Sequence, residues 1–317
     1  AKVVRNNNDK KLIIVIAGET ARADRFSLNG YHRKTNPLLA QKNVVSFGEM
    51  SSCGTDTALS LPCMFSSLNR EDYSHFQGKN MSNVLDILNY AGVEVLWRDN
   101  NSSSKNIADR LPFQDYKSND VNSICDIECR DEGMLSDLQQ YIDSQGNKDI
   151  LIVLHTMGSH GPAYYKRYPK RFEKFTPVCE TNQLNECTNV QINNAYDNTI
   201  VYTDYILSKT IELLQSNQDQ YKTAMFYMSD HGESLGENGL YLHGMPYFIA
   251  PKEQTHVASV LWLDESFSKE VDIQKLKNNS NNIYSHDGFF HALIGLLNVD
   301  TILYDKKLDF IPYIDLH

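Results

Sequence analysis

Five short apolar runs, separated by helical and polar stretches, constrain the fold of this chain more than any other feature. These runs, rich in β-branched and aromatic residues, are residues 12–17, 93–97, 150–155, 224–229 and 257–263. Helical apolar spacing is found at residues 81–90, 134–142, 190–214 and 289–297. Continuous apolar runs of this length are typical of parallel strands that are buried on both faces. The pattern predicts an α/β fold with a mainly parallel central sheet and helices on both faces.

The size and composition of the chain indicate one large globular domain. It has 317 residues, of which 41% are hydrophobic and 22% charged, and this excludes disordered, collagen-like and coiled-coil proteins. A net charge of −10 disfavours nucleic acid as a partner. The polar stretch at residues 5–9 resembles a linker. We therefore expect residues 1–10 to be a linker from a missing N-terminal membrane region and residues 11–317 to form a single catalytic domain.

Cysteine usage indicates an oxidising compartment. The six cysteines lie in three local pairs, Cys53 and Cys63, Cys125 and Cys129, and Cys179 and Cys187. Six cysteines allow about 15 pairings, and the sequential pairing closes the shortest loops at the least cost in entropy. We expect three local disulfides, of which the narrow Cys125–Cys129 loop is the weakest case. The alternative is a structural zinc site, although the three spacings differ and no C-x-x-C occurs.

Polar side chains follow four of the predicted strands, where ligands of parallel sheets bind. They are Glu19 after the first strand, Asn101 and Lys105 after the second, His160 after the third, and Asp230 and His231 after the fourth. Two carboxylates and an imidazole are a suitable ligand set for Zn²⁺. The alternative for each residue alone is structural, because an Asp at a strand end often caps a helix and a Glu there is often solvated.

A hydroxyl group is expected at the start of a helix near Thr57. The segment at residues 51–57 predicts a glycine-containing loop that leads into this helix. Free N–H groups and the helix dipole at such a position favour an alkoxide and a bound phosphate. The alternative is that Asp56 or Thr57 only caps the helix.

Four motifs together resemble one enzyme family. Residues 18–22, 52–57, 158–162 and 229–234, with His243, resemble the catalytic domain of the lipid A phosphoethanolamine transferases. This family includes the colistin-resistance enzymes and belongs to the alkaline phosphatase and sulfatase superfamily. The resemblance implies a zinc site formed by Glu19, Thr57, Asp230 and His231, with Thr57 as the nucleophile. It also implies that substrate phosphate or a second zinc is held by Asn101, Lys105, His160 and His243.

The same resemblance implies a complete activity. Phosphoethanolamine would move from phosphatidylethanolamine to a phosphate of lipid A through a covalent Thr57 ester, which confers resistance to polymyxins and cationic peptides. The expected location is the periplasmic face of the inner membrane of a Gram-negative bacterium, and the expected state is a monomer. Basic and aromatic residues alternate at residues 164–172, and this segment is either a contact with an anionic lipid surface or a solvated loop.

Other functions fit parts of the sequence. Residues 232–236 match G-x-S-x-G, which predicts a serine hydrolase with Ser234 as nucleophile and Asp264 and His291 as partners. A sulfatase activity is disfavoured because no C-x-P-x-R or S-x-P-x-R site is present. A metal-dependent phosphodiesterase or a phosphoglycerol transferase would use the same residues as the transferase. A non-catalytic binding domain stapled by disulfides is the alternative of a different class.

Overall fold

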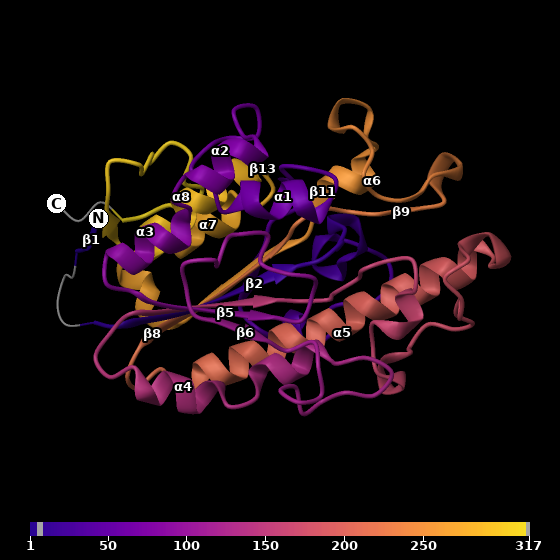
Figure 1. Ribbon diagram of the computed structural model, residues 1–317, viewed down its shortest axis with the longest axis horizontal. Coiled ribbons are helices and arrows are strands. Elements are labelled where there is room, and N and C mark those ends of the chain that lie inside the picture. The colour runs from indigo at the N-terminus through magenta and orange to yellow at the C-terminus, as the bar shows by residue number, and fades with distance from the viewer. Residues whose placement is uncertain (5–8, 315–317) are drawn as a thin grey trace.

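The structure, a computed structural model, describes residues 1–4 and 9–314 and is built around a seven-stranded sheet (Figure 1). From one edge to the other its strands are β3 (Val44–Ser46), β12 (Ser259–Leu263), β8 (Lys222–Ser229), β2 (Lys11–Gly18), β7 (Ile150–His155), β5 (Glu94–Asp99) and β6 (Phe113–Asp115). The neighbouring strands from β8 to β6 are all parallel. The predicted α/β fold with a mainly parallel sheet is confirmed.

The last apolar run was predicted as a parallel strand, and this prediction is wrong. Residues 257–263 divide between β11 (His256–Val257), which joins a small separate sheet, and β12, which runs antiparallel to β8 and to β3. Strand direction depends on the connection to the preceding strand, and no β-α-β crossover helix joins β8 to β12. The apolar pattern does not reveal this, because β12 is buried on both faces in either direction.

Helices cover both faces of the sheet. Alternate residues of β2 divide between the two sides, so that Ile13 and Val15 pack in one core and Leu12 and Ile14 in the other. The first core contains side chains of α1 (Thr57–Met64), α3 (Val84–Tyr90), α7 (Ile273–Asn278) and α8 (Phe289–Leu296). The second contains side chains of α4 (Leu138–Ser144) and α5 (Asn189–Gln215), which lie below the sheet in Figure 1.

Three predicted helices agree with the structure to different degrees. The helix predicted at residues 81–90 begins at Val84, because Asn83 and Asp86 form a capping box. The pattern at residues 134–142 is broken: the 3₁₀ helix Asp131–Leu135 is followed by α4, with Asp137 in the left-handed region at the junction. The longest predicted helix matches α5 to within one residue at each end.

The remaining elements are short. A three-stranded sheet joins β11, β4 (Glu49–Ser51) and β13 (Ile283–Ser285), and β9 (Ser234–Leu235) pairs with β10 (Tyr241–Leu242). The helices α2 (His75–Asn80) and α6 (Lys252–Thr255) lie above the sheet in Figure 1. Of the expected linker at residues 1–10, Lys2–Val3 forms β1 and pairs with β14 (Val299–Asp300), whereas residues 5–8 lie outside the described residues. Within the described ranges no helix has the length and apolar character needed to cross a bilayer.

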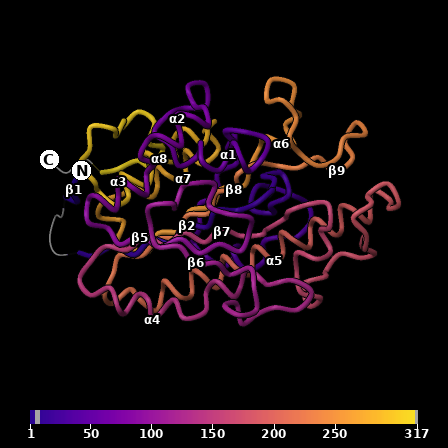
Figure 2. Tube along the Cα trace, in the orientation of Figure 1, coloured from indigo at the N-terminus to yellow at the C-terminus, as the bar shows by residue number. Residues whose placement is uncertain are grey.

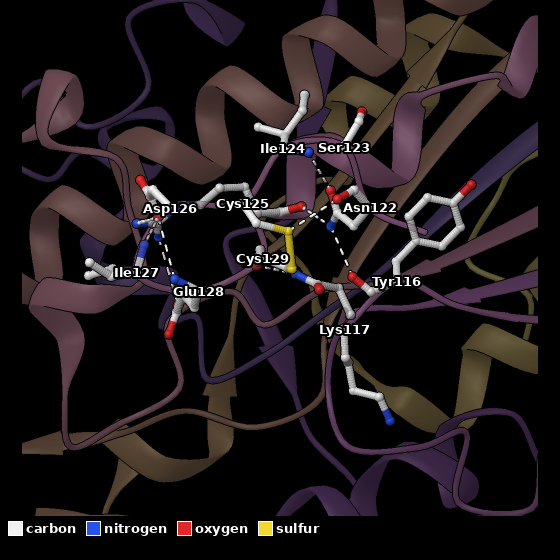
Figure 3. Close-up of a disulfide and its surroundings, with 12 residues drawn as sticks. Tyr116, Lys117, Asn122, Ser123, Ile124, Cys125, Asp126, Ile127, Glu128 and Cys129 are labelled. Atoms are coloured by element: carbon white, nitrogen blue, oxygen red, sulfur yellow. Dashed lines mark hydrogen bonds and ion pairs between the residues drawn. A yellow bond between two sulfur atoms is a disulfide. The ribbon is translucent and has the colours of Figure 1, made fainter. Parts of the chain in front are cut away.

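All three predicted disulfides are present. Cys53 pairs with Cys63, Cys125 with Cys129, and Cys179 with Cys187. Figure 3 shows that Cys125–Cys129 closes a tight turn, and Asn122 beside it donates hydrogen bonds to the carbonyl oxygens of Tyr116 and Arg130. No cysteine in the described chain is free, so the alternative of a cysteine zinc site is wrong.

A buried carboxyl on α5 leads to a prediction of pH-dependent stability. Burial raises the pKa of Asp204 to about 6, although the N–H groups of Leu38 and Leu39 donate to it. An acid with a raised folded pKa destabilises the fold once it ionises, so stability present at pH ~4 is lost as the pH rises through ~6. We measure the unfolding free energy of Asp204→Asn and of wild type by urea denaturation at several pH values. As the pH rises from ~4 to ~7, the difference between the two should shift by about 2–3 kcal/mol in favour of the variant. A constant difference across this range would contradict the prediction.

Candidate active site

The carboxyl edge of the sheet brings two carboxylates and an imidazole together. Glu19 follows β2, and Asp230 and His231 follow β8, which is the direct neighbour of β2. Their ligand atoms lie within 4.8 Å of one another, and all three side chains are completely buried. The predicted convergence of Glu19, Asp230 and His231 is therefore present in the structure.

Thr57 lies beside these three residues. Its backbone starts α1, and Asp56 caps the helix by accepting a hydrogen bond from the N–H of Leu59. The Thr57 hydroxyl donates to Glu19 Oε2 at 3.0 Å, and its oxygen is 3.2 Å from His231 Nε2. Asp56 thus serves as the cap, which leaves the Thr57 hydroxyl directed at the buried carboxylate and imidazole.

The charges of the buried cluster are tightly linked. Burial raises the pKa of Asp230, and the neighbouring Glu19 raises it further. Burial would also raise the pKa of Glu19, but the hydrogen bond and charge of His231 outweigh it and lower the pKa. Burial lowers the pKa of His231, but the charges of Asp230 and Glu19 outweigh it and raise the pKa to about 10. The cluster therefore favours a positive charge at its centre.

One carboxylate oxygen of the cluster lacks a hydrogen bond among the described residues, although His231 Nε2 lies 3.6 Å from it. Asp230 Oδ2 is buried and accepts no hydrogen bond from any part of the chain that the structure describes. A buried carboxylate oxygen that accepts no hydrogen bond is costly unless a cation or a proton compensates it. Together with Glu19, His231 and the Thr57 hydroxyl, it forms an oxygen and nitrogen donor set of the kind that suits zinc.

Asn101 orients Glu19. Its side-chain amide donates to Glu19 Oε2 at 2.8 Å and to the carbonyl oxygen of Thr156 at 2.9 Å. Asp99, at the end of β5, accepts a hydrogen bond from the backbone N–H of Asn101. The resemblance assigned Asn101 to substrate phosphate or a second zinc, whereas the structure directs its amide at the first carboxylate.

The other expected ligands surround the cluster at different distances. The His243 ring centroid is 4.3 Å from that of His231 and 6.3 Å from that of His160. His243 Nδ1 is 2.9 Å from Glu233 Oε1, and this contact holds the ring. Lys105 lines a cavity of about 230 Å³ that Ala58, the neighbour of Thr57, also lines. His160 and His243 therefore form one group beside His231, whereas Lys105 lies in a separate cavity next to α1.

Several supporting residues were not found from the sequence. His286 Nδ1 accepts the N–H of Cys53 at 3.0 Å, and its Nε2 donates to the carbonyl oxygen of Ser229 at 2.9 Å. Burial lowers the pKa of His286 to about 3, so this histidine is neutral. The Ser60 hydroxyl donates to the carbonyl oxygen of Asp230 at 2.5 Å. These contacts join residues 53–60, on both sides of Thr57, to the end of β8, and no motif or spacing in the sequence indicates them.

The structure does not form the serine hydrolase triad. Ser234 is buried, and its hydroxyl accepts a hydrogen bond from Gln254. Asp264 accepts from Thr223 near the start of β8, whereas Ser234 follows the end of that strand. Because β8 has eight residues and is therefore about 23 Å long, Asp264 and Ser234 lie near opposite ends of this strand. His291 accepts the N–H of Asp305 instead of contacting the other two residues, so this interpretation of G-x-S-x-G is wrong.

The basic segment at residues 164–172 is largely neutralised. Arg167 pairs with Glu128 at 2.6 Å, Arg171 with Glu132 at 2.9 Å and Lys170 with Glu173 at 2.7 Å. Of its four aromatic residues, Tyr164 and Tyr168 are buried, and Tyr165 and Phe172 are partly buried. The structure therefore favours the solvated-loop interpretation of this segment over contact with an anionic lipid surface.

The Cys53–Cys63 disulfide encloses Thr57 and predicts a specific loss of activity. A double Cys53→Ala/Cys63→Ala variant should lose about 2–3 kcal/mol of stability and still fold. Its activity should fall more than its melting temperature implies, because the loop that presents Thr57 is no longer tied to α1. Transfer rates and melting temperatures of variants that lack each of the three disulfides test this. Equal activity losses at matched stability would refute it.

The arrangement matches a known family. A mainly parallel sheet with helices on both faces agrees with the alkaline phosphatase and sulfatase type of fold. The family model described as Sulfatase matches residues 11–299. The chain therefore belongs to the sulfatase family.

Within this family the chain is similar to phosphoethanolamine transferases. It is 48% identical to phosphoethanolamine transferase EptA of Escherichia coli (strain K12) over 97% of this chain and 57% of that protein. It is also 48% identical to phosphatidylethanolamine transferase Mcr-1 of Escherichia coli over 94% of this chain and 55% of that protein. The soluble domain of lipooligosaccharide phosphoethanolamine transferase A from Neisseria meningitidis matches with a TM-score of 0.94 and 42% identity, over 98% of this chain and 95% of that domain. The chain spans a little over half the length of EptA and Mcr-1 of Escherichia coli.

Proposed function

We propose that this chain transfers phosphoethanolamine from phosphatidylethanolamine to a phosphate of lipid A. The observation that carries the proposal is the Thr57 hydroxyl, placed at the start of α1 and within hydrogen-bonding distance of both Glu19 and His231. The similarity to EptA and Mcr-1 supports this substrate class, since both are named as transferases of this group.

The proposed cofactor is zinc, held by Glu19, Thr57, Asp230 and His231. Members of the sulfatase and alkaline phosphatase superfamily are metal-dependent, and the Asp230 oxygen that accepts no hydrogen bond suits a cation here. When bound, zinc supplies a Lewis acid that lowers the pKa of a hydroxyl group and offsets the charge of a phosphate.

In the proposed first step, Thr57 Oγ1 attacks the phosphorus of the donor. The Thr57 hydroxyl gives up its proton to water, and the bond from phosphorus to the glycerol oxygen breaks. Diacylglycerol leaves as the alcohol after it takes a proton, for which His243 and His160 are the nearest imidazoles beyond the cluster. A phosphoethanolamine ester remains on Thr57.

In the proposed second step, a phosphate oxygen of lipid A attacks the same phosphorus. The bond to Thr57 breaks, and the threonine oxygen takes from water a proton that replaces the one released in the first step. Both steps place negative charge next to the start of α1, where helix N–H groups favour anions. Lys105, His160 and His243 supply further positive charge or donors for the non-bridging oxygens.

The product has one amine more than lipid A had before. This lowers the negative charge that polymyxins and cationic peptides bind, so the proposed phenotype is resistance to these compounds. The proposed location is the periplasmic face of the inner membrane of a Gram-negative bacterium, with the longer protein anchored in the membrane. The integral membrane protein lipooligosaccharide phosphoethanolamine transferase A (EptA) from Neisseria meningitidis is a solved relative, and this chain covers 59% of its length.

The test is a transfer assay with a labelled headgroup. The zinc-loaded chain is mixed with phosphatidylethanolamine labelled in ethanolamine and with lipid A, and label on lipid A is expected. Release of free phosphoethanolamine would instead favour a phosphodiesterase, and transfer only from phosphatidylglycerol would favour a phosphoglycerol transferase. Absence of both zinc binding and turnover would favour the non-catalytic binding domain.

A further inference from the structure

Two exposed segments with apolar side chains border the site of Thr57. We call Phe76, Met81, Phe248 and Ile249 the apolar rim. Phe76 is 79% exposed on α2, and Phe248 is 87% exposed on the 3₁₀ helix Tyr247–Ile249. Ile249 is 55% and Met81 37% exposed. In Figure 1, α2 and the loop that precedes α6 rise on the same side of the sheet, with α1 between them.

The segment with Phe248 is bound by hydrogen bonds to residues 52–55, which directly precede Asp56 and Thr57. The Thr55 hydroxyl donates to the carbonyl oxygen of Met245 at 2.6 Å, and the N–H of Gly244 donates to the carbonyl oxygen of Thr55 at 2.9 Å. The Tyr247 hydroxyl donates to the carbonyl oxygen of Ser52 at 2.9 Å. Phe248 and Ile249 directly follow Tyr247 in the chain. These contacts therefore hold both side chains at a constant position relative to Thr57.

The two sides of the rim meet through a cation–π contact. The guanidinium of Arg70 lies 4.3 Å from the centroid of the Tyr247 ring, which joins the segment before α2 to the loop before α6. Between α1 and α2, the cavity of about 230 Å³ is lined by Met81, Lys79 and Lys105. The rim thus combines exposed apolar tips with basic side chains next to the nucleophile.

We propose that the apolar rim docks on the surface of a phospholipid bilayer and so delivers a lipid headgroup to Thr57. The proposal rests on the proposed function, because that function makes the donor a diacyl lipid. Moving its acyl chains into water is unfavourable for every methylene exposed. A domain that inserts a few apolar side chains at the interface reaches the headgroup while the chains stay in the bilayer. Lys79 and Lys105 then face the lipid phosphates.

A lipid surface suits the rim better than a protein partner does. The apolar side chains are single tips on two separate segments, and basic residues lie between them, which is typical of interfacial membrane contacts. A protein partner seated on the rim would cover the cavity that Ala58, the neighbour of Thr57, lines. The basic segment at residues 164–172 is the weaker candidate, because Arg167, Lys170 and Arg171 are paired with carboxylates of the protein.

The first test measures binding to vesicles. Phe248→Ser/Ile249→Ser is compared with Ile302→Ser, a matched control at a side chain that is 102% exposed. Ile302 follows β14, which pairs with β1 at the end of the molecule away from α6 and β9 in Figure 2. On vesicles of phosphatidylethanolamine and phosphatidylglycerol, we expect the partition coefficient of the rim variant to fall at least about fivefold, and that of the control to stay within about twofold of wild type. No binding by wild type, or equal losses in both variants, would overturn the proposal.

The second test separates the rim from the proposed function. Transfer is measured from phosphatidylethanolamine in vesicles and from a short-chain phosphatidylethanolamine below its critical micelle concentration. The ratio of the two rates should fall at least about fivefold in the rim variant, with melting temperatures matched. An unchanged ratio would overturn the rim proposal. If wild type transfers from neither donor, the proposed function fails, and the vesicle-binding result alone decides whether the rim binds lipid.

Discussion

Replacing Thr57 with alanine is expected to abolish phosphoethanolamine transfer without unfolding the domain. Thr57 is the only hydroxyl among the described residues that contacts both Glu19 and His231, so its loss removes the atom that would form the covalent ester. Asp56, not Thr57, caps α1, and the helix should therefore persist. We expect the rate to fall by about a thousandfold or more, with a melting temperature close to wild type. Headgroup transfer and thermal denaturation measure the two effects.

Two further measurements identify the nucleophile directly. Thr57→Ser keeps the hydroxyl and loses only the methyl group that restricts its rotamers, so some activity should survive. Mass spectrometry of wild type exposed to phosphatidylethanolamine should map the adduct to Thr57. Transfer by Thr57→Ala, or an adduct on Ser234, would show that the mechanism is wrong.

Glu19→Gln and Asp230→Asn are expected to lose zinc and activity together. Each change removes one negative charge from a buried cluster in which the ligand atoms of two carboxylates and His231 lie within 4.8 Å of one another. A buried cation without that charge is strongly disfavoured. We expect zinc affinity to fall by at least about a hundredfold, beyond the 10–100-fold typical of changes one layer outside a metal site. Metal content after dialysis and competition with a chelator measure this without relying on activity.

Asp264→Asn is the matched control for the zinc experiment. Asp264 is also a largely buried carboxylate, but it bonds to Thr223 near the opposite end of β8. It should keep its zinc and, at matched stability, its activity. Full zinc content in both Glu19→Gln and Asp230→Asn would refute the proposed ligand set. Loss of zinc with undiminished transfer would refute the role of the metal.

Local patterns were sufficient for the layers of this fold but not for all strand directions. The apolar run of β2 and the helical spacing of α5 depend on residues close in sequence, and both elements formed where predicted. The direction of β12 depends on how a long connection returns to the sheet, which no local pattern encodes. The break before α4 depends on a single left-handed residue, Asp137, which interrupts a continuous apolar stripe.

The sequence by itself determined which chemical groups stand at the strand ends. Glu19, Asp230 and His231 were predicted to converge because neighbouring parallel strands place their carboxyl ends at one edge, and this depends only on the strand assignment. Only the tertiary structure decided which neighbours orient them. Asn101 directs its amide at Glu19, which lies 82 residues away in the sequence. His286 joins Cys53, 233 residues away, to the carbonyl oxygen of Ser229. Such contacts result from the packing of whole elements, so the physical reason they escaped prediction is that no local propensity or spacing reports a distance between distant parts of the chain.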